Sequence, residues 1–209
     1  SGFLATKLYA RRAPANLVAR PRITALLDQG LSASLILVSA PAGFGKTTLL
    51  AEWFGNRPHD SCWLSLDAAD NDPVRFLSYV IAALQQRVPG LADDCVAALR
   101  SPRPPSAEAA LTTLVNELAP LPDPLILVLD DYHVITSTAV NGALTFLVEN
   151  LPPSLRLVIS TRADPPIPIA RLRSRGQVVE IRTDDLRFTP DEAAAFLNQA
   201  MGLGLSFQQ

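Results

Sequence analysis

The sequence predicts an α/β protein with a five-stranded, mainly parallel sheet covered by helices on both faces. Five apolar runs of strand length, rich in Val, Ile and Leu, lie at residues 35–39, 62–66, 125–130, 155–160 and 177–181. Runs of this kind are typical of strands buried on both faces. Between them, apolar residues recur three and four apart, as in helices, at 47–54, 73–87, 107–118, 140–150 and 168–175. Alternating strands and helices favour a parallel sheet in a three-layer α/β/α sandwich.

Turn residues mark the boundaries of these elements. Pro89-Gly90 is expected to end one helix, and S-P-R-P-P-S at 101–106 is expected to join two helices. Thr189-Pro190-Asp191-Glu192 has the pattern of a capping box, with proline at the first helical position, and predicts a last helix to about residue 200. We therefore interpret residues 1–209 as a single domain, cut from a longer protein because it starts without methionine and ends just beyond this helix.

Composition excludes several classes of protein. The chain has 209 residues, is 48% hydrophobic, and has a formal net charge of −2, which gives no overall attraction to nucleic acid. We therefore expect no specific DNA binding by this chain. No apolar stretch approaches the roughly 20 residues of a membrane helix, so we expect a cytoplasmic protein. Cys62 and Cys95 lack metal-ligand spacing and are expected to be reduced thiols, and His59 and His133 stand alone.

The segment S-A-P-A-G-F-G-K-T-T at 39–48 follows the first apolar run directly. Its octet A-P-A-G-F-G-K-T matches the phosphate-loop pattern G-x-x-x-x-G-K-[ST], except that Ala40 replaces the first glycine. We expect the loop at Pro41, Ala42, Gly43, Phe44 and Gly45, continuing into Lys46, Thr47 and Thr48, to bind nucleotide phosphates. Lys46 would reach the β- and γ-phosphates, and the Thr47 hydroxyl would bind Mg²⁺. The alternative is an ordinary glycine turn before a helix that carries an exposed lysine.

A second acidic motif supports the phosphate-loop interpretation. L-I-L-V-L-D-D at 125–131 is an apolar run that ends in two carboxylates. Asp130, at the carboxyl end of a buried strand, is placed to hold Mg²⁺, and Asp131 is placed to orient or deprotonate a water. The alternative is a turn into Tyr132.

Arginines provide two weaker signals. Arg162 ends the run L-R-L-V-I-S-T-R and could read a γ-phosphate, or it could be an ordinary surface residue. R-L-R-S-R at 171–175 could be a basic contact patch, but arginines at a helix end before Gly176 are better explained by the helix dipole.

Taken together, these motifs resemble the nucleotide-binding (NB-ARC/NACHT-like) domain of STAND-class ATPases, and in particular of large LuxR-type transcriptional regulators related to the maltose-regulon activator. The matching segments are S-A-P-A-G-F-G-K-T-T-L-L-A-E-W at 39–53, W-L-S-L-D-A-A-D-N-D-P-V-R-F at 63–76, L-V-L-D-D-Y-H at 127–133, S-T-R-A-D-P-P at 160–166 and D-L-R-F-T-P-D-E-A at 185–193. They occur in the family's order and cover most of the chain.

The resemblance implies details that the residues alone do not give. The Arg162 strand should lie between the phosphate-loop strand and the Asp130 strand. Residues 1–30 should form an adenine-covering segment and a helix, with Val18 and Arg20 over the adenine. Residues 31–200 should form the α/β core, and 201–209 should begin a linker to a lid, a winged helix, helical repeats and a helix-turn-helix region outside this chain. Those regions would bind inducer and DNA, and the ATP state of the full-length protein would self-associate.

Two functions remain open at this point. The first is an ATP/ADP switch whose slow ATPase activity, with Lys46 and Asp131 as catalytic residues, resets a signalling state in the full-length protein. The second is a small-molecule kinase or another metabolic phosphotransferase, which should carry an acceptor pocket and an arginine-rich lid within the domain. Release of phosphate from ATP without an added acceptor would distinguish them.

Overall fold

The computed structural model describes residues 4–10, 18–56 and 60–201 of the chain. Its centre is a five-stranded sheet with the order β2-β3-β4-β1-β5. All four strand pairings are parallel. The strands are β1 (Leu35–Ser39), β2 (Ser61–Ser65), β3 (Leu125–Asp130), β4 (Leu155–Thr161) and β5 (Val178–Ile181). The predicted fold class is confirmed, and β4, which precedes Arg162, lies between β1 and β3 as the resemblance implied.

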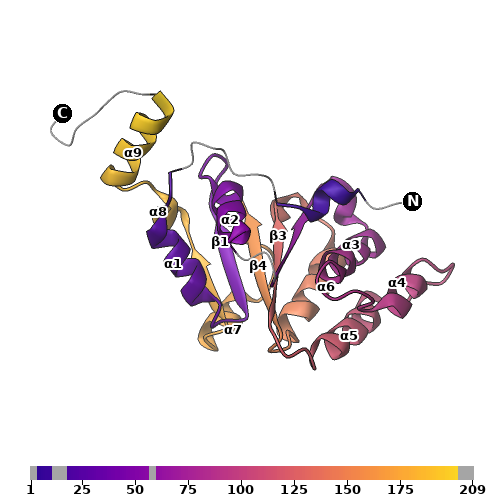
Figure 1. Ribbon diagram of the computed structural model, residues 1–209. Coiled ribbons are helices and arrows are strands. Elements are labelled where there is room, and N and C mark those ends of the chain that lie inside the picture. The colour runs from indigo at the N-terminus through magenta and orange to yellow at the C-terminus, as the bar shows by residue number, and fades with distance from the viewer. Residues whose placement is uncertain (1–3, 11–17, 57–59, 202–209) are drawn as a thin grey trace.

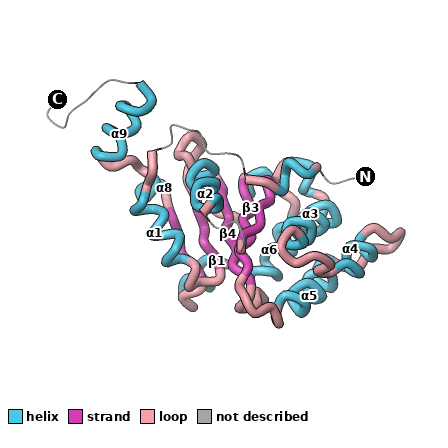
Figure 2. Tube along the Cα trace, in the orientation of Figure 1, coloured by secondary structure: helices cyan, strands magenta, loops and turns pink. Residues whose placement is uncertain are grey.

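Helices cover both faces of the sheet, as Figures 1 and 2 show. The α-helices are α1 (Pro21–Gly30), α2 (Lys46–Gly55), α3 (Pro73–Gln85), α4 (Asp93–Leu99), α5 (Ala107–Leu118), α6 (Thr138–Glu149), α7 (Ile169–Ser174), α8 (Thr183–Leu186) and α9 (Pro190–Met201). Short 3₁₀ helices are η1 (Ala5–Leu8), η2 (Ala68–Asn71) and η3 (Tyr132–Val134).

Alternate residues of the central strands enter two separate cores. Leu35, Leu37 and Leu127 pack with the helices α3 to α7, whereas Ile36 and Val38 pack with α1 and α2. This alternation follows from the period-two geometry of a strand. Because both faces are buried, the strands read as continuous apolar runs in the sequence.

The predicted elements agree with the structure to within a residue or two. The strands β1 and β3 and the helix α5 have the expected bounds, while β2 begins and ends one residue earlier than predicted. The helix α4 was not predicted, because it spans seven residues and gains its support from tertiary packing, through the buried Cys95 and Leu99. The segment 101–106 joins α4 to α5, as expected of a helix connection.

The predicted capping box before α9 is present. The Thr189 N–H donates to Glu192 Oε2 at 3.1 Å, and the Glu192 N–H donates to Thr189 Oγ1 at 3.2 Å. The start of α9 is therefore fixed locally, which matters because α9 carries one wall of the pocket described below.

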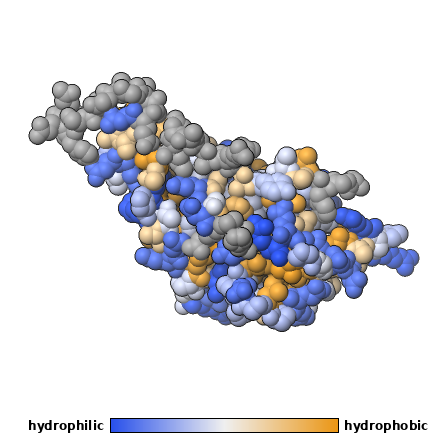
Figure 3. All heavy atoms as spheres, viewed as in Figure 1, coloured by the Kyte–Doolittle hydropathy of each residue, from blue (hydrophilic) through white to orange (hydrophobic). Residues whose placement is uncertain are grey.

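The surface seen in Figure 3 is mixed in hydropathy, and both cysteines are buried. On the face seen in Figure 3, the described residues present interspersed hydrophilic and hydrophobic areas. None of the helices among the described residues is long and apolar enough to cross a membrane. Cys62 and Cys95 are buried free thiols, as predicted, and burial raises the pKa of Cys62 to about 12.

Candidate nucleotide-binding site

The loop between β1 and α2 has the backbone geometry of a phosphate cradle. Gly43 and Gly45 have φ angles of 87° and 72°, in the left-handed region that favours glycine. A Cβ atom added to either residue would meet nothing within 4 Å, so the loop faces open space. Gly45 precedes the first residue of the ten-residue helix α2, where free backbone N–H groups and the helix dipole favour an anion.

Lys46 is held inside this loop. Its Nζ donates to the carbonyl oxygens of Ala40 at 2.6 Å and Pro41 at 2.9 Å, and the side chain is buried. Burial lowers the pKa of Lys46 below its ordinary value, and the nearby Arg162 guanidinium lowers it further. The alternative of an exposed lysine is therefore wrong, and the ammonium sits where an anion would relieve its unfavourable environment.

Thr47 and Asp130 meet beside the cradle. The Thr47 hydroxyl donates to Asp130 Oδ1 at 3.1 Å, although the two residues are 83 positions apart in the sequence. Burial raises the pKa of Asp130, the Asp131 charge raises it too, and the Ser160 and Thr47 hydroxyls partly offset both effects. A hydroxyl and a carboxylate in contact at a strand end form a suitable oxygen pair for Mg²⁺.

Removal of the Asp130 charge should stabilise the nucleotide-free fold. A carboxyl whose pKa is raised by folding binds more protons in the folded state, so its contribution to stability falls as pH rises. We expect Asp130→Asn to unfold at a higher urea concentration than the wild type at pH 7. The difference should shrink near pH 4, where carboxyl groups protonate in both states. Equal urea midpoints of the variant and the wild type at pH 7, or an increase in midpoint that does not change with pH, would contradict a raised pKa of Asp130.

Asp131, His133 and Arg162 lie around the same end of the sheet. Asp131 follows β3 with a left-handed φ of 60°, and its Oδ1 lies 3.7 Å from His133 Nδ1. Burial lowers the pKa of His133, as does the charge of Arg162. The Arg162 side chain is exposed, and it makes no hydrogen bond or ion pair with another described residue. Its guanidinium is thus available to a ligand.

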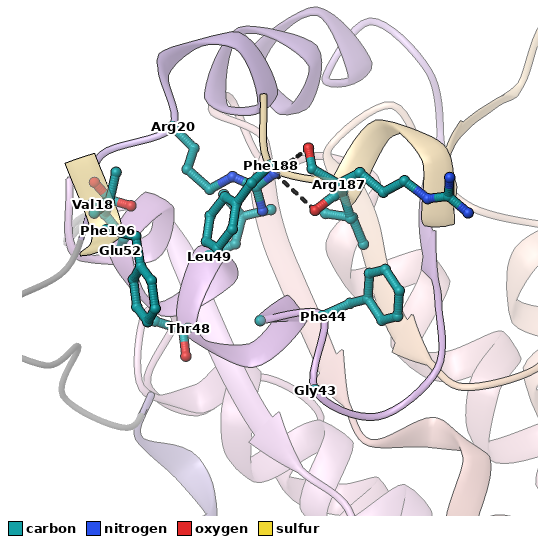
Figure 4. Close-up of a pocket in the computed structure, with 12 residues that line it drawn as sticks. Val18, Arg20, Gly43, Phe44, Thr48, Leu49, Glu52, Arg187, Phe188 and Phe196 are labelled. Atoms are coloured by element: carbon teal, nitrogen blue, oxygen red, sulfur yellow. Dashed lines mark hydrogen bonds between the residues drawn. The ribbon is translucent and has the colours of Figure 1, made fainter. Parts of the chain in front are cut away.

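A pocket opens next to the glycine loop, with a volume of about 490 Å³. Figure 4 shows its walls, which come from the N-terminal segment, the loop, α2 and the α8–α9 segment. Most of the lining is apolar, and Phe188 stacks on Phe196 with ring centroids 5.6 Å apart. The full lining is Val18, Arg20, Gly43, Phe44, Gly45, Thr48, Leu49, Glu52, Leu186, Arg187, Phe188 and Phe196. An apolar, aromatic pocket joined to an anion cradle suits a flat heteroaromatic base.

Arg20 ties the pocket walls together. Its Nη2 donates to the carbonyl oxygens of Leu186 at 2.8 Å and Arg187 at 3.1 Å. Its guanidinium also lies over the Phe188 ring, 4.7 Å from the centroid. The Nε of this buried side chain has no hydrogen-bond partner among the described residues. Arg20 therefore positions the aromatic wall and keeps one donor unused.

The structure thus brings the predicted site residues together in two groups. Lys46, Thr47, Asp130, Asp131 and Arg162 meet at the carboxyl end of the sheet. Val18 and Arg20 line the pocket with Gly43, Phe44, Gly45 and Thr48, whereas Pro41 and Ala42 are exposed loop residues outside that lining. Residues 1–3 and 11–17 of the predicted adenine-covering segment, and residues 202–209 of the predicted linker at 201–209, lie outside the described residues, as does His59.

Sequence reasoning missed several residues of the site. Leu49, Glu52 and the α8–α9 residues Leu186 to Phe188 and Phe196 were not named as lining residues, and His133 was interpreted as standing alone. Glu52 could have been found, because it follows Thr48 by one helical turn and shares its face. The α8–α9 wall could not, because its approach to the loop depends on tertiary contacts.

The segment 63–76, one of those that resemble the STAND-class family, has a structural role in the described residues. The Asp67 side chain accepts from the Ala69 N–H at 2.8 Å and begins η2, and Asp72 accepts from the Arg75 N–H at 2.7 Å and begins α3. The buried Lys7 of η1 donates to Asp67 at 3.0 Å and also contacts Asp70. This segment therefore anchors η1 and orients α3 rather than lining the pocket.

Arg171 and Arg173 are engaged in ion pairs at the end of α7. Arg171 Nη1 lies 2.7 Å from Glu149 Oε1, and Arg173 Nη2 lies 2.7 Å from Glu180 Oε1. These pairs, together with the helix end, account for both arginines without a separate basic contact patch.

A glycine loop leading into α2, an acidic residue at the end of β3 and the order β3-β4-β1 together define a P-loop ATPase fold. Solved structures share this fold. The Walker-type ATPase PABY2304 of Pyrococcus abyssi matches 95% of this chain and 62% of its own length, with a TM-score of 0.53 and 16% identity. CDC6p from Pyrobaculum aerophilum matches 91% of this chain and 52% of its own, with a TM-score of 0.56 and 16% identity.

In sequence, the chain is related to HTH-type transcriptional regulators named MalT. It is 41% identical over 183 residues to MalT of Serratia proteamaculans and 39% identical over 181 residues to MalT of Cronobacter sakazakii. These matches cover 88% and 87% of this chain but 20% of each relative, so the chain spans about a fifth of their length. No family model matches the chain. The resemblance that the motifs indicated is confirmed.

Proposed function

We propose that this chain is the ATP/ADP-binding switch domain of a signal-responsive transcriptional regulator. The observation that carries the proposal is the continuity of the glycine loop with the aromatic pocket, because Gly43, Gly45 and Thr48 belong to both. Phosphates would lie on the loop from Pro41 to Thr48, and the adenine would lie in the pocket. The free Nε of Arg20 could donate to a ring nitrogen of the base.

Mg²⁺ would be held by Thr47 and Asp130 together with the phosphates. The described residues contain no group of three or more His, Cys, Asp or Glu side chains suited to a metal, so the ion would depend on the nucleotide for further ligands. When bound, the ion supplies charge stabilisation at the phosphates. Asp131 follows Asp130 in a left-handed backbone conformation and would orient an attacking water in the full-length protein.

Arg162 would distinguish ATP from ADP. It follows β4, whose last residues Ser160 and Thr161 are buried, so its backbone is fixed while its side chain remains available. A guanidinium can pair with a γ-phosphate and finds no such partner in ADP. A ligand shifts a conformational equilibrium only through differential affinity, and this contact supplies one.

Removal of the Arg162 side chain should therefore weaken ATP binding selectively. We expect Arg162→Ala to lose about 1.5 to 3 kcal/mol of ATP affinity, as for a lost charge-assisted hydrogen bond, with little change for ADP. Calorimetric titration of the full-length regulator with each nucleotide gives the ratio, and ATP-dependent self-association should fade with it. Arg175→Ala removes an exposed arginine away from the loop and serves as the control. An unchanged ATP/ADP ratio in Arg162→Ala would remove this residue from the switch.

The regulatory part of the proposal is supported by the MalT relatives, which are transcriptional regulators by name. Binding of inducer and DNA would belong to regions outside this chain, and action in the cytoplasm would follow from such a role. The same relationship favours a switch over a small-molecule kinase. Release of phosphate from ATP by the full-length protein without an added acceptor would support the switch.

A further inference from the structure

Glu52 brings a negative charge into a pocket that otherwise suits an aromatic base. Among the 12 residues that line the pocket, it is the acidic one. Its carboxylate makes no hydrogen bond or ion pair with a described residue, whereas Arg20 donates to the carbonyl oxygens of Leu186 and Arg187 in the α8–α9 wall. In the view of Figure 4, Glu52 lies at the Val18 and Phe196 end of the pocket, away from Phe44.

The position of Glu52 limits what it can bind. Thr48 lies in the first turn of α2 at the cradle, and Glu52 is four residues further on, about 6 Å along the same helix face. A carboxylate repels phosphate, so Glu52 is unsuited to the phosphate end of a ligand. It accepts hydrogen bonds only, and it can accept two at once. The part of a nucleotide that lies between the phosphates and the base and offers donors is the sugar with its paired hydroxyls.

We infer that Glu52 binds the ribose hydroxyls of the nucleotide and makes the site selective for ribonucleotides over deoxyribonucleotides. The inference rests on the proposed function, since it requires a nucleotide in this pocket. Acidic side chains recognise ribose hydroxyls in the same way in unrelated dinucleotide sites. The rest of the pocket would bind a base by apolar contact, which does not depend on the sugar.

The test compares ATP with 2′-deoxy-ATP and 3′-deoxy-ATP, by calorimetric titration of the wild-type chain, Glu52→Gln and Glu52→Ala with Mg²⁺ present. The readout is the ratio of the affinities for ATP and each deoxy analogue. Loss of a negative charge near phosphates raises affinity for every nucleotide, and the ratio removes that shared effect. Glu108→Gln, which removes an exposed carboxylate in the first turn of α5, is the matched control.

We expect the wild type and Glu108→Gln to prefer ATP over a deoxy analogue by about tenfold, as for a lost hydrogen bond to a charged group. The preference should fall toward one in both Glu52 variants. Inosine triphosphate, which lacks the 6-amino group, tests the other donor of ATP. The inference would be overturned if the wild type binds ATP and the deoxy analogues equally well. It would also be overturned if a Glu52 variant keeps the preference for ribose and loses the preference for ATP over inosine triphosphate. Either outcome would leave nucleotide binding intact. A wild type that binds none of these nucleotides would overturn the proposed function as well.

Discussion

Lys46→Ala should lose ATP and ADP binding by at least about a hundredfold. In the structure, the Nζ of Lys46 donates to the carbonyl oxygens of Ala40 and Pro41. The loop has open space at Gly43 and Gly45. On binding, the ammonium would exchange those carbonyls for charged phosphate oxygens, and loss of a desolvated charge pair typically costs several kcal/mol. Calorimetric titration with each nucleotide in the presence of Mg²⁺ measures the effect.

Two controls separate the role of Lys46 from general effects of charge and folding. Arg103→Ala removes an exposed positive charge in the α4–α5 connection and should bind nucleotide as the wild type does. Circular dichroism should show that Lys46→Ala keeps its helical content, because Lys46 contributes hydrogen bonds to the loop rather than to the core. Wild-type nucleotide affinity in folded Lys46→Ala would refute the assignment of the loop.

Trp53→Ala should lower the free energy of unfolding by about 3 to 5 kcal/mol, the usual cost of removing a large aromatic side chain from a core. Trp53 is 1% exposed and belongs to the core between the sheet, α1 and α2. Its indole Nε1 donates to Asp28 Oδ1 at 2.8 Å, which joins α2 to α1. Urea unfolding monitored by circular dichroism gives the change directly.

Trp53→Phe divides this effect into its parts. Phenylalanine keeps most of the buried volume but cannot donate to Asp28, so we expect a smaller loss of about 1 to 3 kcal/mol from the lost hydrogen bond to a carboxylate. Phe196→Ala is the exposed aromatic control, since its side chain is 42% exposed, and it should change stability little. Equal stability of Trp53→Ala and the wild type would show that α1 and α2 do not share the core described here.

The sheet and the phosphate end of the site could be predicted from the sequence because both depend on local patterns. Buried parallel strands are continuous apolar runs, and the glycine loop lies within one short segment that joins β1 to α2. Asp130 was assigned through the rule that ligands bind at the carboxyl ends of parallel strands. Its contact with Thr47 at 3.1 Å agrees with that reasoning.

The base end of the site could not be predicted in the same way. Phe188 and Phe196 belong to a segment that is tethered by Arg20 and Arg22, more than 160 residues earlier, which donate to its carbonyl oxygens. No spacing in the sequence encodes those contacts. Glu52 had a local signal, since it lies four residues after Thr48 on the same face of α2, but helical spacing also describes core residues.

The central claim is that the glycine loop and the aromatic pocket form one nucleotide site. A crystal structure of the chain with Mg²⁺ and a non-hydrolysable ATP analogue tests it most directly. We predict phosphate oxygens on the backbone N–H groups of residues 43–48, Lys46 Nζ released from Ala40 and Pro41, and the base against Val18, Phe188 and Phe196. An analogue bound elsewhere, with Lys46 still on those carbonyls and the pocket empty, would contradict the claim.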